Sequence, residues 1–166
     1  MKDHLAYARY VIRHKRFVLQ ACRLVHASMF RGLVHDLSKF LPSEWFPYVH
    51  RFYAPDGSKR YIETEDFNLA WCLHQKRNLH HWQAWVVVMD RGDLVPLPMP
   101  EKCVREMVAD WIGAGLAITG KQDVIGWYSK SCHKMILHED TRALVEQILA
   151  DFGFRPDHTE REGVNA

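Results

Sequence analysis

The sequence predicts an all-α protein, a compact single-domain bundle of about six or seven helices. Apolar residues recur at steps of three and four over most of the chain, and 166 residues are the length of one compact domain. The single β-branched run, at 86–88, has no partner strand in the sequence, so we expect no sheet. Hydrophobic residues make up 48% of the chain and aromatic residues 12%, enough for a packed core, which excludes disorder for most of its length.

The first half of the chain predicts three helices. The first covers residues 4–26, and its apolar stripe runs through Tyr7, Val11, Val18 and Val25. His14 lies on that stripe. A second helix of about three turns is expected over 30–40, and Pro42 opens a third that continues to Phe52.

The second half carries the remaining elements. Thr64 is a predicted N-cap, and the helix that it opens either breaks near Asn78 or continues past it. Glycines close two later helices, at Gly120 and Gly153. The elements in chain order are a loop over 54–60, the helix from Thr64, helices over 100–119, 124–130 and 141–152, and a flexible charged tail over 155–166 that follows the domain at 1–154.

Composition places the protein inside the cell. The longest apolar run, Ala84 to Met89, is far shorter than the roughly 20 residues that cross a bilayer. The charged N-terminus lacks the apolar stretch of a signal peptide, so we expect a cytoplasmic protein without a membrane partner. The four cysteines form no C-x-x-C pair and are expected to be buried, reduced thiols: Cys22, Cys72, Cys103 and Cys132.

Positive charge is concentrated near the N-terminus. Residues 1–39 hold eight Lys and Arg against Asp3 and Asp36, a charge of +6, so the rest of the chain carries −4 within the total of +2. Such a segment favours an anionic ligand such as a phosphate, although a solvated helix face explains it equally well.

Histidines supply the main chemical pattern, with eleven in the chain. His14 lies on an apolar stripe and Asp110 lies beside the apolar stripe of 100–119, where an unpartnered imidazole or carboxylate is costly. The adjacent pair His35-Asp36 is able to reach one divalent cation. A metal ion bound by these four residues would remove the free-energy cost of burying both the imidazole of His14 and the carboxylate of Asp110.

The order His14, His35-Asp36, Asp110 resembles the HD phosphohydrolase superfamily, in which a helical bundle directs such ligands at a divalent metal. The phrases HDLSKF from His35, AWCLHQKRNLHHW from Ala70 and EMVADW from Glu106 are similar to a small, mostly phage-encoded, uncharacterised HD-like branch, over about residues 5–150. The resemblance implies four metal ligands: His14, His35, Asp36 and Asp110.

Between Asp36 and Asp110 the chain also has His74, His80 and His81. This order resembles the two-metal branch of the superfamily, in which extra histidines bind a second ion. If the helix continues past Asn78, His74 and His81 share a face and His80 points elsewhere; if it breaks, both members of the doublet converge. One or two divalent ions are therefore expected, and the choice among Mn, Fe, Ni, Co, Zn and Mg stays open.

The resemblance implies that a metal-activated water hydrolyses a phosphate ester of a nucleotide or other small phosphorylated molecule. Asp36, Lys39 and Glu106 are the expected catalytic residues, and Lys39 and Asn78 the expected substrate contacts. Each of these residues also has a simpler interpretation. Lys39 could equally be a surface lysine and Asn78 a helix C-cap, and for Glu106 an exposed helical residue is favoured over a role in the site.

The other histidines and the tryptophans have simpler interpretations. His26 falls near the end of the first helix, where a cation is favoured by the helix dipole, and four further histidines are expected on the surface or in turns: His50, His133, His138 and His158. Five tryptophans are expected to pack in the core in preference to forming a stacking wall for a base: Trp45, Trp71, Trp82, Trp85 and Trp111.

The alternative function is a non-catalytic HD-like binding protein that holds nucleic acid or a partner protein through its basic N-terminal helix. A closed coordination sphere would indicate this role, whereas an open position would indicate catalysis. No Gly-x-Ser-x-Gly elbow and no helix-turn-helix pattern is present, so a serine hydrolase and a sequence-specific DNA binder are disfavoured. A homodimer is compatible with the sequence.

Overall fold

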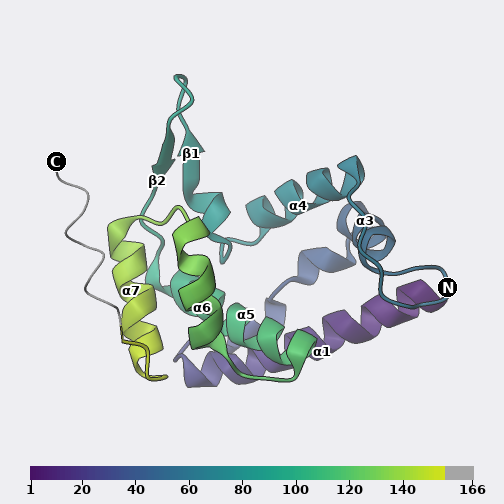
Figure 1. The fold of residues 1–166 in the computed structure, drawn as a ribbon, viewed down its shortest axis with the longest axis horizontal. Helices are drawn as coiled ribbons and strands as arrows, with labels where there is room; N and C mark the ends of the chain where they lie inside the picture. Colours follow the sequence, from purple (N-terminus) through teal and green to yellow (C-terminus); the bar gives the residue numbers. More distant parts are fainter. Residues whose placement is uncertain (156–166) are drawn as a thin grey trace.

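Seven α-helices and one short β-hairpin are present in residues 1–155, the part of the chain that the computed structural model describes (Figure 1). The predicted single helical domain is confirmed. The predicted tail lies outside the described residues from position 156 onward, and so does His158. The α-helices are α1 Lys2–Leu24, α2 Met29–Val34, α3 Pro42–Phe52, α4 Glu65–Arg77, α5 Glu101–Thr119, α6 Val124–Ser131 and α7 Glu139–Ala150. Three short 3-10 helices are η1 Leu37–Phe40, η2 Trp82–Trp85 and η3 Cys132–Lys134.

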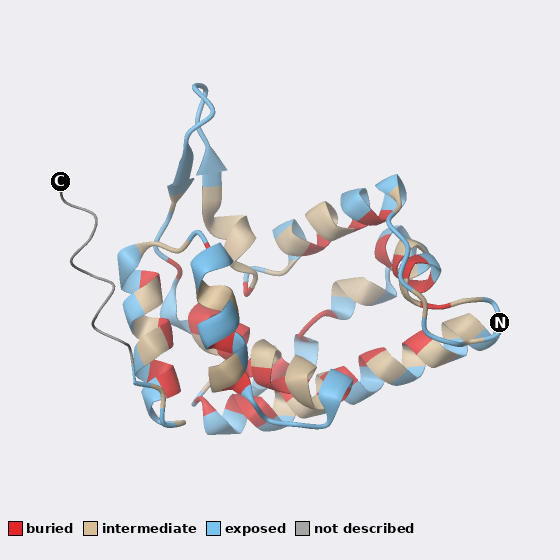
Figure 2. Ribbon diagram, in the orientation of Figure 1, coloured by how far each residue is buried: buried red, intermediate tan, exposed pale blue. Residues whose placement is uncertain are grey.

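Helix α1 contributes to both hydrophobic cores. Its second half packs, through Val18, into a core built mainly from α5, α6 and α7, which we call the α5 core. Its first half packs, through Tyr7 and Val11, against α3 and α4 in a second core, the aromatic core. Figure 2 shows the buried side of α1 turned toward these neighbours. His14 lies between Val11 and Val18 and is only 1% exposed, so the two cores meet at an imidazole.

A glycine lets α1 and α5 approach closely. A Cβ atom on Gly113 would lie 2.5 Å from Val18 Cγ2 and 2.7 Å from Val18 N, distances that no packed side chain tolerates. Val18 lies one turn after His14, and Gly113 lies three residues after Asp110. The close contact therefore brings His14 and Asp110 together.

The predicted helix over 30–40 is interrupted, and this prediction was wrong. Helix α2 ends at Val34, and η1 begins at Leu37. Between them Asp36 has φ 54°, in the left-handed region that costs a non-glycine residue on the order of 1 kcal/mol. The backbone oxygen of His35 accepts a hydrogen bond from Lys15 on α1. The pair His35-Asp36 thus lies in a sharp bend tied to α1, and strain of this kind is concentrated at functional sites.

Several predicted boundaries are confirmed. Helix α3 covers the predicted residues, and Thr64 Oγ1 caps α4 by accepting a hydrogen bond from Phe67 N at 3.4 Å. Gly120 ends α5 with φ 73°. Helix α1 begins and ends two residues before the predicted limits.

The β-hairpin corrects the expectation that no sheet forms. Strand β1, Val86–Val88, pairs with β2, Leu94–Pro96, in antiparallel register from Val86 opposite Pro96 to Val88 opposite Leu94. The partner strand is hidden in the sequence because its last residue is a proline, which cannot donate to the ladder. In Figure 1 the hairpin projects away from the helices.

Two further sequence-based expectations can be compared with residues 1–155. None of their helices is long and apolar enough to cross a membrane. All four cysteines are free, but only Cys22 and Cys103 are buried, whereas Cys72 and Cys132 are half-buried. The prediction of four buried thiols is therefore confirmed for two of them.

Candidate metal centre

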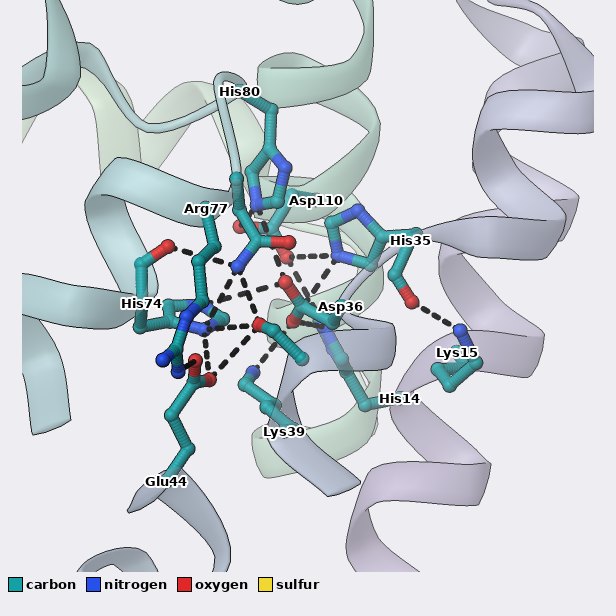
Figure 3. A network of polar contacts seen from close by, with 12 residues as sticks. His14, Lys15, His35, Asp36, Lys39, Glu44, His74, Arg77, His80 and Asp110 are labelled. Carbon is teal, nitrogen blue, oxygen red and sulfur yellow. Dashed lines mark hydrogen bonds and ion pairs between the residues drawn. The ribbon is translucent and has the colours of Figure 1, made fainter. Parts of the chain in front are cut away.

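Five histidines and two aspartates from five segments of the chain meet between the two cores. Figure 3 labels all of them except His81. They come from α1, the bend after α2, α4, the turn after α4, and α5: His14, His35, Asp36, His74, His80, His81 and Asp110. All seven were predicted metal ligands. They form two overlapping groups in which the ligand atoms all lie within 4.8 Å of one another. The first ligand group is His14, His35, Asp36 and Asp110, and the second ligand group is Asp36, His74, His80 and His81.

The Asp36 carboxylate belongs to both groups and turns one oxygen to each. Its Oδ2 lies 3.5 Å from His14 Nε2 and 3.3 Å from His35 Nε2. Its Oδ1 lies 3.3 Å from His74 Nε2 and 3.5 Å from His80 Nε2. Asp36 is 1% exposed, so bulk water does not reach its carboxylate.

Asp110 completes the first ligand group from α5. Its Oδ1 lies 3.2 Å from His14 Nε2 and 3.4 Å from His35 Nε2. Its Oδ2 lies farther, 3.9 Å, from His80 Nε2. Asp110 is therefore close to the histidines of the first ligand group and lies farther from those of the second.

The imidazoles point unpaired nitrogens at these carboxylates. Among residues 1–155, the Nε2 atoms of all five histidines are buried without a hydrogen-bond partner: His14, His35, His74, His80 and His81. For His14, His35, His74 and His80 the distances from Nε2 to Asp36, 3.3–3.5 Å, exceed the roughly 2.7–2.9 Å of a charge-assisted hydrogen bond. They lie at or slightly above the separation of about 3.0–3.4 Å between two ligands that each bind one ion at about 2.1 Å. This donor set fits a divalent metal ion.

Two outer carboxylates orient the histidines from behind. His35 Nδ1 donates to Glu106 Oε1 at 3.0 Å, and His80 Nδ1 lies 3.3 Å from the same oxygen. His74 Nδ1 donates to Glu44 Oε2 at 2.8 Å. A proton held on Nδ1 leaves the Nε2 lone pair free for a metal, which is the usual role of such carboxylates.

Arginines neutralise these outer carboxylates. Arg31 contacts Glu106 at 2.6 Å, and Arg77 contacts Glu44 at 2.7 Å. Although burial alone would raise the pKa of Glu106, hydrogen bonds from His35 and His80 lower it to about 2. Both outer carboxylates are thus ionised and paired with arginines.

The inner carboxylates are also ionised. Burial would raise the pKa of Asp36, but the adjacent His35 imidazole and the Lys39 ammonium outweigh it and hold the pKa well below its usual range. Burial is likewise outweighed at Asp110, where the close His14 and His35 imidazoles hold the pKa of the carboxyl well below its usual range. Lys39 Nζ lies 2.6 Å from Asp36 Oδ2, and this contact raises its pKa despite burial. Lys39 is therefore a charged residue of the site, and the surface interpretation was wrong.

The expectation that Glu106 is exposed was also wrong, since it is 4% exposed and orients two ligands. It contacts the Nδ1 atoms of His35 and His80, on the side away from Asp36, as a positioning residue would, and its predicted catalytic role stays a prediction. Sequence reasoning missed Glu44, Arg31 and Arg77. A glutamate in the first turn of a helix is ordinary, and nothing in the sequence marks Glu44 as buried.

Helix α4 ends at Arg77, with Asn78 as its C-cap. Of the two predicted alternatives, the one in which the helix breaks near Asn78 and both His80 and His81 converge is therefore correct. Its Nδ2 donates to His74 O at 2.8 Å and to Ser38 Oγ at 2.7 Å. The chain then turns and directs both His80 and His81 at Asp36. Since its Nδ2 makes both of these bonds, Asn78 holds the turn, and its predicted contact with substrate stays a prediction.

The remaining histidines and the tryptophans match their simpler interpretations. His26 is exposed just beyond α1, His50 and His133 are exposed, and His138 caps α7 by accepting from Asp140 N at 3.2 Å. The five tryptophans are half-buried against the two cores. Trp71 also stacks on His74, with ring centroids 5.6 Å apart.

Comparison with known proteins adds a family. A family model described as a family of unknown function (DUF5662) matches residues 3–151. The comparisons with curated proteins and with solved structures found no match. Because the matched segment contains most of the chain and every member of both ligand groups, the protein belongs to this family of unknown function.

Proposed function

We propose that this protein is a metal-dependent phosphohydrolase that cleaves a phosphate ester of a nucleotide or other small phosphorylated molecule. The observation that carries the proposal is the set of five unpaired Nε2 atoms around Asp36 and Asp110. Burying so many polar atoms without partners is costly, and a divalent cation would satisfy all of them at once. The order of the ligands along the chain also resembles that of HD phosphohydrolases.

The geometry favours two ions that share Asp36. Its two oxygens face different histidines, as a bridging carboxylate would, and each ligand group supplies four donors. Mixed imidazole and carboxylate ligands suit Mn, Fe, Co, Ni or Zn better than Mg, which prefers oxygen. Availability in the cell would decide among them.

Divalent ions at such a site lower the pKa of a bound water and polarise the phosphoryl oxygens. The protein's own groups supply the rest. Lys39 is the one cation in contact with Asp36 in the described chain, and its Nζ lies where it would neutralise and orient the phosphate. Asp36 and Asp110 would hold the ions, and Glu106 and Glu44 would keep the imidazoles in the binding tautomer. Asp36 and Lys39 are therefore the residues to which we assign catalytic roles.

A second candidate function is the predicted binding protein, favoured by a row of exposed arginines along α1: Arg9, Arg13, Arg16 and Arg23. In that case the metal would be structural and the arginines would hold nucleic acid or a partner protein. Metal-dependent turnover distinguishes the two functions.

The test is phosphate release by protein purified without a His tag, stripped with chelator and reloaded separately with Mn, Fe, Co, Ni or Zn. Nucleoside mono-, di- and triphosphates, p-nitrophenyl phosphate and bis-p-nitrophenyl phosphate would serve as substrates. We expect release with at least one metal, its loss in Asp110→Ala, and its retention in His133→Ala, an exposed histidine away from the site. Metal binding without turnover of any substrate would favour the binding protein.

A further inference from the structure

A cavity of about 600 Å³ adjoins the candidate metal centre. Lys39 lines this cavity and also contacts Asp36, so it belongs to both. The volume lies in the range of about 300–1,000 Å³ in which drug-sized ligands bind, and it exceeds what a phosphate ion needs.

The lining of the cavity includes buried hydroxyl groups. Tyr7 and Tyr48 line it, and neither hydroxyl has a hydrogen-bond partner among the residues that the structure describes. Burial raises the pKa of both tyrosines, and the negative charge of Asp36 raises it further. The two hydroxyls therefore stay protonated and could donate to oxygens of a ligand.

The walls of the cavity are aromatic. Six of its ten lining residues carry aromatic rings, including Phe52 and Tyr53. The Tyr7 and Tyr53 ring centroids lie 6.2 Å apart, and those of Tyr48 and Phe52 lie 6.0 Å apart. Such walls favour a flat ring over an aliphatic group, because stacked rings attract each other beyond the effect of burial alone.

The charge of the cavity is positive. Three lining residues are cations, Lys39, Lys59 and Arg60, and no carboxylate is among the described residues that line it. Lys59 is exposed, so positive charge also reaches the rim. A lining of this kind attracts anions.

From these features we propose that the cavity binds the nucleoside part of a nucleotide, with the phosphate at Lys39 and the base between the aromatic walls. The inference rests on the proposed function for the chemistry at the metal centre, but the binding of a nucleoside does not require hydrolysis. A sugar phosphate would use Lys39 and leave the aromatic walls without a partner. A free phosphate would leave most of the cavity unused.

The experiment is calorimetric titration of the metal-loaded protein with adenosine, guanosine, cytidine and uridine, each compared with ribose. Nucleosides carry no phosphate to hydrolyse, so binding is measured apart from turnover. We expect at least one nucleoside to bind at least about tenfold more tightly than ribose.

Two isoleucines provide a matched pair of variants. Ile118 on α5 lines the cavity and is 58% exposed, whereas Ile12 on α1 is 53% exposed and lies outside it. Ile118→Glu replaces an apolar wall by a charge and should weaken nucleoside binding by about tenfold or more, whereas Ile12→Glu should leave it unchanged. Because both positions are exposed, neither variant should unfold the protein.

Two results would overturn the assignment: no nucleoside binds more tightly than ribose, or both isoleucine variants weaken binding equally. The proposed hydrolysis can fail separately. Nucleoside binding that depends on Ile118 but is accompanied by no phosphate release from any substrate would leave the cavity assignment standing. Metal-dependent phosphate release without any nucleoside binding would keep the hydrolase and remove the cavity assignment.

Discussion

The two ligand groups share Asp36 but are built differently. The first takes His14 and Asp110 from the interiors of α1 and α5, the two longest helices, where their backbones are hydrogen-bonded on both sides. The second takes His74 from the last turn of α4 and two histidines from the turn that follows.

The two ligand groups are held in place by different contacts. In the first group the close contact at Gly113 fixes the distance between the two helices. In the second, the amide of Asn78 ties the end of α4 to Ser38 and so sets the direction of the turn. Segments with few packed neighbours open more easily, so we expect the second group to bind its ion more weakly.

The largest effects should come from removing one ligand of each group. His14→Ala should abolish the tightly bound ion and reduce phosphate release to background, because its Nε2 faces both Asp36 and Asp110. His80→Ala should remove about one of two ions and leave the first bound. Metal content after gel filtration measures both, with His133→Ala as the surface control. Equal loss of metal in the two variants would show that the groups do not bind separately.

Smaller effects should follow from the orienting carboxylates. Glu106→Gln acts on His35 and His80 and should weaken both ions, by about 10–100-fold in affinity. Glu44→Gln acts on His74 and should weaken only the ion of the second group, by a similar factor. Competition titration against a metal-chelating dye resolves the two affinities. An unchanged affinity in Glu106→Gln would remove its positioning role.

The smallest expected effect comes from a variant that tests the contact between α1 and α5. Gly113→Ala forces a methyl group against Val18 and should lower stability by about 1–3 kcal/mol, through overpacking. The melting temperature should then fall by about 2–12 °C, and metal affinity in the first group should fall with it. Gly115→Ala is the control, since its added Cβ would meet only Lys121 O, at 3.3 Å. Melting curves without and with Mn²⁺ measure both effects, and equal behaviour of the two variants would contradict the close contact.

Much of this arrangement could be predicted from the sequence, because a polar residue on the apolar stripe of a helix stands out from the helical periodicity. His14 on an apolar stripe and Asp110 beside one are such exceptions, and the structure brings them together. The left-handed bend at Asp36 could not be predicted, because apolar residues continue at helical spacing through 30–40. The bend is accompanied by a long-range contact, the hydrogen bond from Lys15 to the His35 carbonyl, which sequence periodicity does not reveal.

The outer shell could not be predicted for a similar reason. Glu44 and Glu106 occupy positions where an exposed glutamate is normal, and only the packing of α3, α4 and α5 around the centre buries them. The partner of β1 was also hidden, because the prolines near β2 are typical of loops.

The central claim is that Asp36 joins two metal sites. Its most direct test is elemental analysis of protein purified without a His tag, wild type beside Asp36→Ala, with circular dichroism to confirm that both are helical. The account predicts about two divalent ions per chain in the wild type and none retained in the variant. Absence of metal from the wild type after incubation with Mn, Fe or Ni, or full metal content in Asp36→Ala, would contradict it.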